Sequence, residues 1–82
     1  MLKEKIKNDV QASIPGIDIK IFTNDNKYFN AIFITDVFKD KNLLDRQKLI
    51  HDIIGEYITS RQIHAISFKT YTNNEWAEEN KD

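Results

Sequence analysis

The spacing of the apolar residues changes along this chain, and that change constrains the fold more than any other feature. Near the start, apolar residues recur every four positions, which places them on one face of a helix: Leu2, Ile6 and Val10. Further on they alternate with polar residues, as in a strand with one buried face: Ile17, Ile19 and Ile21. Pro15 and Gly16 separate the two patterns, since Pro15 disfavours helical geometry at the residue before it.

The next part of the chain predicts a hairpin. Residues 23–27 are rich in turn formers and should join the first strand to a second one over residues 28–35. This second strand ends in the segment 31–34 (AIFI), which is apolar on both faces and indicates a central strand covered on both sides there. Residues 36–42 form a polar connection with room for one helical turn around Val37 and Phe38.

A long helix should follow this connection. Asn42 can cap it, with Asp45 well placed for the helix dipole. Its apolar stripe consists of Leu43, Ile50, Ile53, Ile54, Tyr57 and Ile58.

The last third of the chain predicts a strand and a short helix. In residues 63–71, Ile66 and Phe68 share one face of a strand, and Ser67 and Lys69 share the other. The segment 72–75 (TNNE) is a capping box that opens a helix carrying Trp76. We expect the polar tail, residues 77–82, to fray.

Taken together, the patterns predict one domain over residues 1–82, with the order α-β-β-α-β-α. Elements of this kind form a two-layer α+β domain, with helices on one face of a three-stranded mixed sheet. We expect six apolar side chains to meet in its core: Ile19, Ile21, Ile50, Ile54, Ile66 and Phe68.

Composition narrows the function. The 82 residues include no cysteine, so the chain has no disulfide, thiolate nucleophile or thiolate ligand of its own. The net charge of −1 argues against a general nucleic-acid binder. No apolar run reaches the roughly 20 residues of a membrane helix, and the N-terminus lacks the apolar region of a signal peptide. We therefore expect a cytoplasmic protein with no membrane partner.

Two histidines are candidate ligands, each with a plainer alternative. His64 stands at the mouth of the third strand, on the parity of Ile66 and Phe68, and is either a half-buried histidine at the sheet edge or an exposed metal ligand. His51 lies at the border of the apolar stripe, where a ring edge packs and a nitrogen faces water. One histidine cannot hold a metal alone, so a ligand role requires donors from elsewhere.

A basic cluster follows the second strand: Lys39, Lys41, Arg46 and Lys48. These side chains could contact phosphate, but Asp36, Asp40, Asp45 and Asp52 interleave with them and favour a solvated, self-neutralising face. A KH-type module would need a Gly-x-x-Gly loop, and the two glycines lie far apart. No catalytic motif is present, so we expect no enzyme.

Residues 61–76 (RQIHAISFKTYTNNEW) resemble the C-terminal signature of the BolA family, which runs Ile/Val-His-Ala-Leu/Val-Ser and then Thr-Pro-x-Glu-Trp. Upstream, residues 36–38 (DVF) and 44–47 (LDRQ) look like the family's D-x-F…L-x-R-H segment. The chain resembles most the short YrbA-type branch, which often has Gln in place of that last His.

The resemblance implies an α-β-β-α-α-β-α fold, related to the class II KH fold without its glycine loop. It also implies partnership with a monothiol glutaredoxin. In such heterodimers a 2Fe–2S cluster is held by glutaredoxin and glutathione thiolates together with a BolA histidine, which corresponds to His64. Because the chain has no cysteine and its two histidines lie on different elements, we expect no cofactor for the chain alone.

The sequence departs from the family pattern at three positions. Tyr28 stands where many members have a His or Cys loop ligand, so cluster sharing would rest on His64. Asn73 replaces a Pro at the first helical position, which is tolerable there, and Asp40 replaces a common Gly. We assign Tyr28, Arg61 and Lys69 to the partner interface.

Two rival functions stay open. One is a DNA-binding transcriptional regulator of the BolA type, using the basic cluster, and the other is a protein–protein adaptor that binds no cluster. The leading prediction is an adaptor or regulator in iron–sulfur and iron homeostasis and stress response, a monomer or weak homodimer by itself.

Overall fold

The computed structural model describes residues 2–81 of the chain. Its elements are, in order, α1 (Leu2–Ser13), β1 (Asp18–Thr23), β2 (Tyr28–Ile34), the 3-10 turn η1 (Asp36–Phe38), α2 (Leu43–Thr59), β3 (Ala65–Tyr71) and α3 (Asn73–Glu79). The predicted α+β class and element order are confirmed. The additional helix implied by the family resemblance corresponds to η1, which forms at the predicted helical turn.

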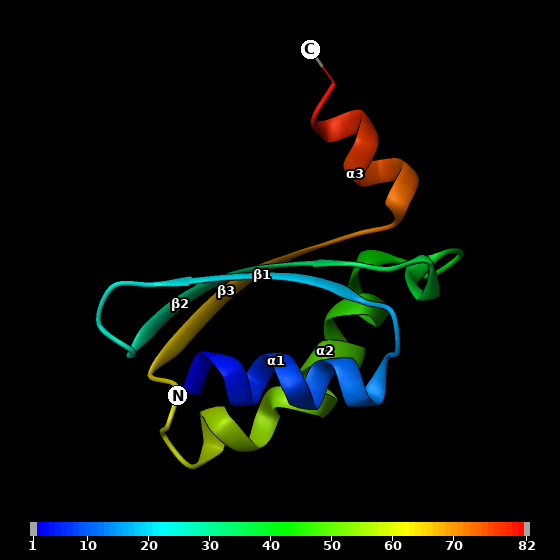
Figure 1. Ribbon diagram of the computed structural model, residues 1–82. Helices are drawn as coiled ribbons and strands as arrows, with labels where there is room; N and C mark the ends of the chain where they lie inside the picture. The colour runs from blue at the N-terminus through cyan, green and yellow to red at the C-terminus, as the bar shows by residue number, and fades with distance from the viewer. Residues whose placement is uncertain (1, 82) are drawn as a thin grey trace.

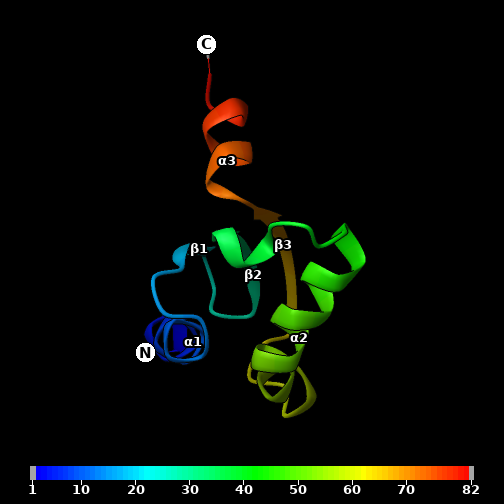
Figure 2. The same cartoon turned by 90° about the vertical axis from the view of Figure 1, so that its right-hand side faces the viewer.

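The three strands form one sheet in the order β1-β2-β3. β1 pairs with β2 antiparallel, and β2 pairs with β3 parallel, so the predicted mixed sheet is confirmed. α1 and α2 lie side by side against one face of this sheet (Figure 1). α3 continues from the end of β3 and projects to the other side of the sheet, as Figure 2 shows. The two long helices therefore cover one face, and α3 stands apart from their layer.

The core lies between the sheet and the two long helices. Alternation places Ile19 and Ile21 of β1 against the helices, and Ile50 and Ile54 of α2 meet them there. Ile66 and Phe68 pack against this core from β3 but are only partly buried. The six residues predicted for the core thus share one cluster, with two of them at its margin.

The end of β2 is buried on both faces. Phe33 points into the core, and its neighbour Ile34 on the opposite face is also buried. This confirms the prediction drawn from the apolar segment 31–34. Ile34 lies in register with Asp18 of β1 and with Tyr71 of β3, and the Tyr71 ring contacts the Trp76 ring of α3.

Both predicted helix caps form. The Asn42 side chain accepts a hydrogen bond of 2.8 Å from the Asp45 amide at the start of α2. Thr72 and Glu75 make the reciprocal capping box at the start of α3. Such caps satisfy amide groups that have no partner within the helix.

Three local predictions were wrong. Leu43 is 61% exposed rather than part of the buried stripe, because it lies two helical turns before Ile50, at the very start of α2 and beyond the core. The third strand begins at Ala65 rather than at Ile63. Residues 77–79, expected to fray, complete α3, since the capping box and the Tyr71–Trp76 contact support that helix. Residue 82 lies outside the described residues.

Candidate functional site

Tyr28 and His64 meet at one end of the sheet. β2 and β3 run parallel and start at the same edge, with Tyr28 in register with Ala65. The carbonyl of Lys27 accepts hydrogen bonds from the amides of His64 and Ala65, at 2.9 and 3.1 Å. The rings of Tyr28 and His64 pack edge to face with their centroids 5.1 Å apart, and both side chains are exposed. The two positions singled out in the sequence are therefore neighbours.

The hairpin before β2 fixes the backbone at Tyr28. The Asp25 carboxylate accepts hydrogen bonds from the amides of Lys27 (2.9 Å) and Tyr28 (3.1 Å). The hydrogen bond from Tyr28, followed by that from Lys27, holds the pKa of Asp25 below its usual value, so the turn is held by an ionised carboxylate. Asn26 adopts a left-handed conformation with φ of 60°, which asparagine tolerates well.

A buried isoleucine directs His64 to the surface. Arg61, with φ of 66°, turns the chain after α2. Ile63 then inserts into the core, and its amide donates a hydrogen bond of 2.9 Å to the Tyr57 carbonyl. Because His64 precedes the strand, the alternation of β3 does not set its direction. Its side chain is exposed and its ring packs on Tyr28, whereas Ile66 and Phe68 pack against the core.

His64 supplies one exposed imidazole at this end of the sheet. Within residues 2–81 there is no group of three or more His, Cys, Asp or Glu side chains that could hold a metal ion. His51 packs elsewhere, with its ring 5.4 Å from that of Phe68 and its side chain otherwise exposed, as predicted from the helical wheel. A metal centre that used His64 would therefore need its other ligands from a second molecule.

The other two predicted interface residues lie at different distances from His64. Arg61 is exposed in the turn just before it. Lys69 is exposed on the sheet face away from the long helices, in register with Ile32, and five residues along an extended strand place it about 16 Å from His64. A surface that includes both residues must run along the sheet.

The basic cluster is divided by the fold. The Arg46 guanidinium pairs with the Glu75 carboxylate through bonds of 2.6 and 3.1 Å. Its Nε donates to the Lys41 carbonyl, and the group lies over the Phe38 ring. Arg46 is thus engaged within the chain rather than free for phosphate, while Lys39, Lys41 and Lys48 remain exposed. The hydrogen bond from Arg46, followed by that from the Thr72 amide, lowers the pKa of Glu75 to about 2.

The family model described as BolA-like protein matches residues 1–75 of this chain. The chain belongs to the BolA-like family. The acid stress protein IbaG of Escherichia coli is 32% identical over 59 residues, which cover 72% of this chain and 70% of IbaG. The DNA-binding transcriptional regulator BolA of the same species is 22% identical over 85 residues, covering 93% and 80% of the two chains.

The BolA fold is also shared with solved structures. BolA1 from Arabidopsis thaliana superposes with a TM-score of 0.76 at 20% identity, over 88% of this chain and 92% of that chain. The likeness to IbaG agrees with the resemblance to the YrbA-type branch. None of the helices in residues 2–81 is long and apolar enough to cross a bilayer.

Sequence reasoning missed one part of this BolA-like surface. Phe22 is 55% exposed on the same sheet face as Lys69. The sequence of β1 contains a signal for it. Asp18, Lys20 and Phe22 alternate onto the same face of the strand, and Phe22 is the one large apolar residue among them.

Proposed function

We propose that this BolA-like protein is an adaptor that pairs with a monothiol glutaredoxin and contributes His64 as one ligand of a shared 2Fe–2S cluster. The observation that carries the proposal is the position of His64. Its imidazole is exposed at the sheet edge, and its backbone is fixed by the hydrogen bond to the Lys27 carbonyl. A partner can therefore reach a pre-positioned nitrogen without rearranging the fold.

The residues around His64 define what the chain itself supplies. The edge-to-face contact with Tyr28 restrains the imidazole ring, and Ile63 anchors the turn that carries it. With no cysteine in the chain, the thiolate ligands come from the partner and from glutathione. A histidine in place of a thiolate raises the potential of a 2Fe–2S cluster.

The test is replacement of His64 by Ala in a mixture with a cluster-loaded monothiol glutaredoxin. The wild-type chain should change the visible circular dichroism of the cluster, and His64→Ala should abolish that change. His51→Ala is the matched control, because this ring packs on Phe68 and should leave the spectrum as in the wild type. Tyr28→His should strengthen cluster retention, since it adds a donor beside His64.

One outcome would favour the adaptor that binds no cluster. If the chain bound glutaredoxin without changing the cluster spectrum, and if neither His64→Ala nor Tyr28→His altered this result, the protein would be a protein–protein adaptor that binds no cluster.

A DNA-binding regulator is the second candidate, since the Escherichia coli relative BolA carries that name. In this chain the exposed Lys39, Lys41 and Lys48 would have to carry the contacts, without Arg46. We expect only non-specific binding that falls steeply with salt. A sequence-specific complex that survives at about 150 mM salt would favour this second function. The name of IbaG supports a role in stress response, and a cytoplasmic location remains a prediction.

A further inference from the structure

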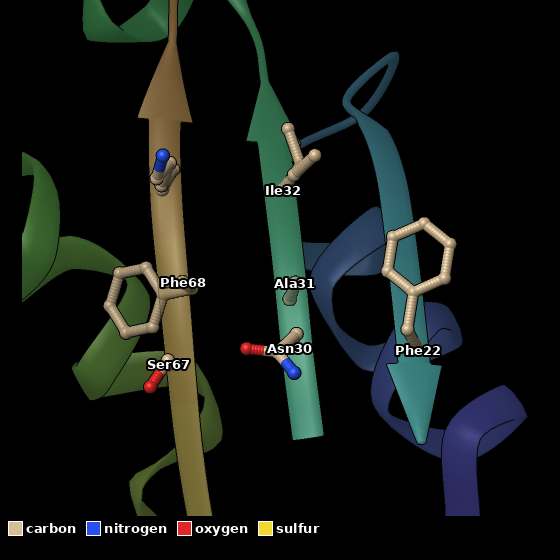
Figure 3. Close-up of a pocket in the computed structure, with 7 residues that line it drawn as sticks. Phe22, Asn30, Ala31, Ile32, Ser67 and Phe68 are labelled. Carbon is tan, nitrogen blue, oxygen red and sulfur yellow. The ribbon is translucent and has the colours of Figure 1, made fainter. Parts of the chain in front are cut away.

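The sheet face opposite α1 and α2 carries an exposed apolar strip. Figure 3 shows this face, with Phe22 on β1 standing beside Asn30 and Ile32 on β2 and Ser67 on β3. A shallow hollow of about 320 Å³ lies over it. The residues that line the hollow are Phe22, Asn30, Ala31, Ile32, Ser67, Phe68 and Lys69. We call the outward-facing residues of this sheet the open face: Lys20, Phe22, Asn30, Ile32, Ser67 and Lys69.

The strand register arranges the open face in rows. Phe22, Asn30 and Ser67 form one row across the three strands, and Lys20, Ile32 and Lys69 form the next. Outer strands of a three-stranded sheet lie about 10 Å apart, so the two long lysine side chains flank Ile32 closely enough to approach one anionic group. Among residues 2–81 the only ion pair is that of Arg46 with Glu75, so neither lysine is engaged in an ion pair there.

Carboxylates lie at both ends of the open face. Beyond the lysine row lie Asp18 and Ile34 with Tyr71, and the groove between Tyr71 and α3 is lined by Glu75, Glu78 and Glu79. An acidic ligand is repelled there and attracted to the lysine row. At the other end the Asp25 carboxylate lies beside Tyr28, so an acidic group would bind in the middle of the face, over the lysine row.

The open face is continuous with the site at His64. Phe22 and Asn30 also line a second hollow, of about 170 Å³, together with Asp25 and Tyr28. The Tyr28 ring in turn contacts His64. A molecule bound at His64 can thus extend over Tyr28 and Phe22 to Lys69 without crossing a helix.

We infer that the open face binds an acidic segment of the same partner protein that reaches His64. An acidic side chain of the segment lies over Lys20 and Lys69, and a neighbouring apolar side chain packs between Phe22 and Ile32. This inference rests on the proposed function and extends its interface along the whole sheet. It also gives Lys69, about 16 Å from His64, a role in the same complex.

The test measures the affinity of cluster-free monothiol glutaredoxin for four variants by titration calorimetry. The double variant Lys20→Glu/Lys69→Glu should bind about tenfold more weakly or worse at low salt, because reversed charges at an interface repel the partner. Lys5→Glu/Lys7→Glu makes the same change of net charge on the exposed side of α1 and should bind like the wild type. Phe22→Ser should also weaken binding, and Lys20→Arg/Lys69→Arg should retain it.

Salt gives a second measurement. The wild-type affinity should fall as salt is raised, because salt screens the attraction between the lysines and the acidic segment. The affinity of Lys20→Glu/Lys69→Glu should not fall with salt, because this variant has no such attraction to screen. Equal affinities of the two double glutamate variants would overturn the inference while leaving the proposed function intact. A wild-type chain that does not bind glutaredoxin at all would overturn both.

A second copy of the chain is the competing occupant, with the acidic α3 of one molecule on the lysine row of another. Sedimentation velocity of the free protein distinguishes it. The inference would be overturned if the wild-type chain were a dimer that glutaredoxin does not dissociate and if Lys20→Glu/Lys69→Glu were a monomer. The open face would then be assigned to self-association.

Discussion

Replacing Ile54 by Ala should cost a large share of the stability of this domain. The Ile54 side chain lies on α2, faces the sheet and is fully buried in the core. At about 0.8 kcal/mol per buried methylene, the lost transfer free energy is roughly 2 kcal/mol. The cavity left behind brings the expected loss in the free energy of unfolding to about 2–5 kcal/mol, against the roughly 5–15 kcal/mol that small domains have in total.

Urea denaturation followed by far-ultraviolet circular dichroism measures this loss. With a slope of about 1–3 kcal/mol per molar urea, the midpoint should fall by about 1 M or more. Leu44→Ala is the matched control, because it shortens an aliphatic side chain of the same helix that is 59% exposed. Its effect should stay within about 0.5 kcal/mol.

Equal midpoints for Ile54→Ala and Leu44→Ala would refute the reasoning. Ile66→Ala should fall between them, since Ile66 packs against the core from the edge strand but is only partly buried. If Ile54→Ala and Ile66→Ala both unfolded at the wild-type midpoint, the core would be assigned wrongly.

Three further predictions concern charge and metal content. The pKa of Glu75, lowered from 4.5 to about 2, means that its pair with Arg46 contributes stability above about pH 5 that is lost as the pH falls toward 2. The side chain of Glu75 is 47% exposed, so Glu75→Gln, which keeps the capping box, should cost less than about 1 kcal/mol at pH 7 and still less at pH 3. A urea midpoint difference that is the same at both pH values would contradict this. Tyr57→Phe removes the hydrogen bond to Asp9 that raises the pKa of Tyr57 to about 12. It should cost about 1–2 kcal/mol at neutral pH, a difference that shrinks as the pH rises from 10 toward 12; equal thermal midpoints at pH 7 would disprove it. Finally, the isolated chain should purify colourless under anaerobic conditions, and iron at stoichiometric amounts would show that it binds a metal alone.

Interactions between sequence neighbours made several elements predictable. The caps at Asn42 and Thr72 depend on a partner three residues away, so the starts of α2 and α3 can be read from the sequence. Leu43 shows the limit of such reasoning, because its helical position is correct but the core does not extend as far as the start of α2.

The sequence by itself determined the order of the helices and strands, the side of each strand that is buried, and His64 as the candidate ligand. Only the tertiary structure decided which side chains meet. The parallel register of β2 and β3 brings Tyr28 to His64, the pairing of Arg46 with Glu75 removes a cation from the basic cluster, and the same register aligns Lys20, Ile32 and Lys69. Alternation and capping arise within a few residues of the chain, whereas these contacts join residues far apart in it and depend on how strands pair and helices pack.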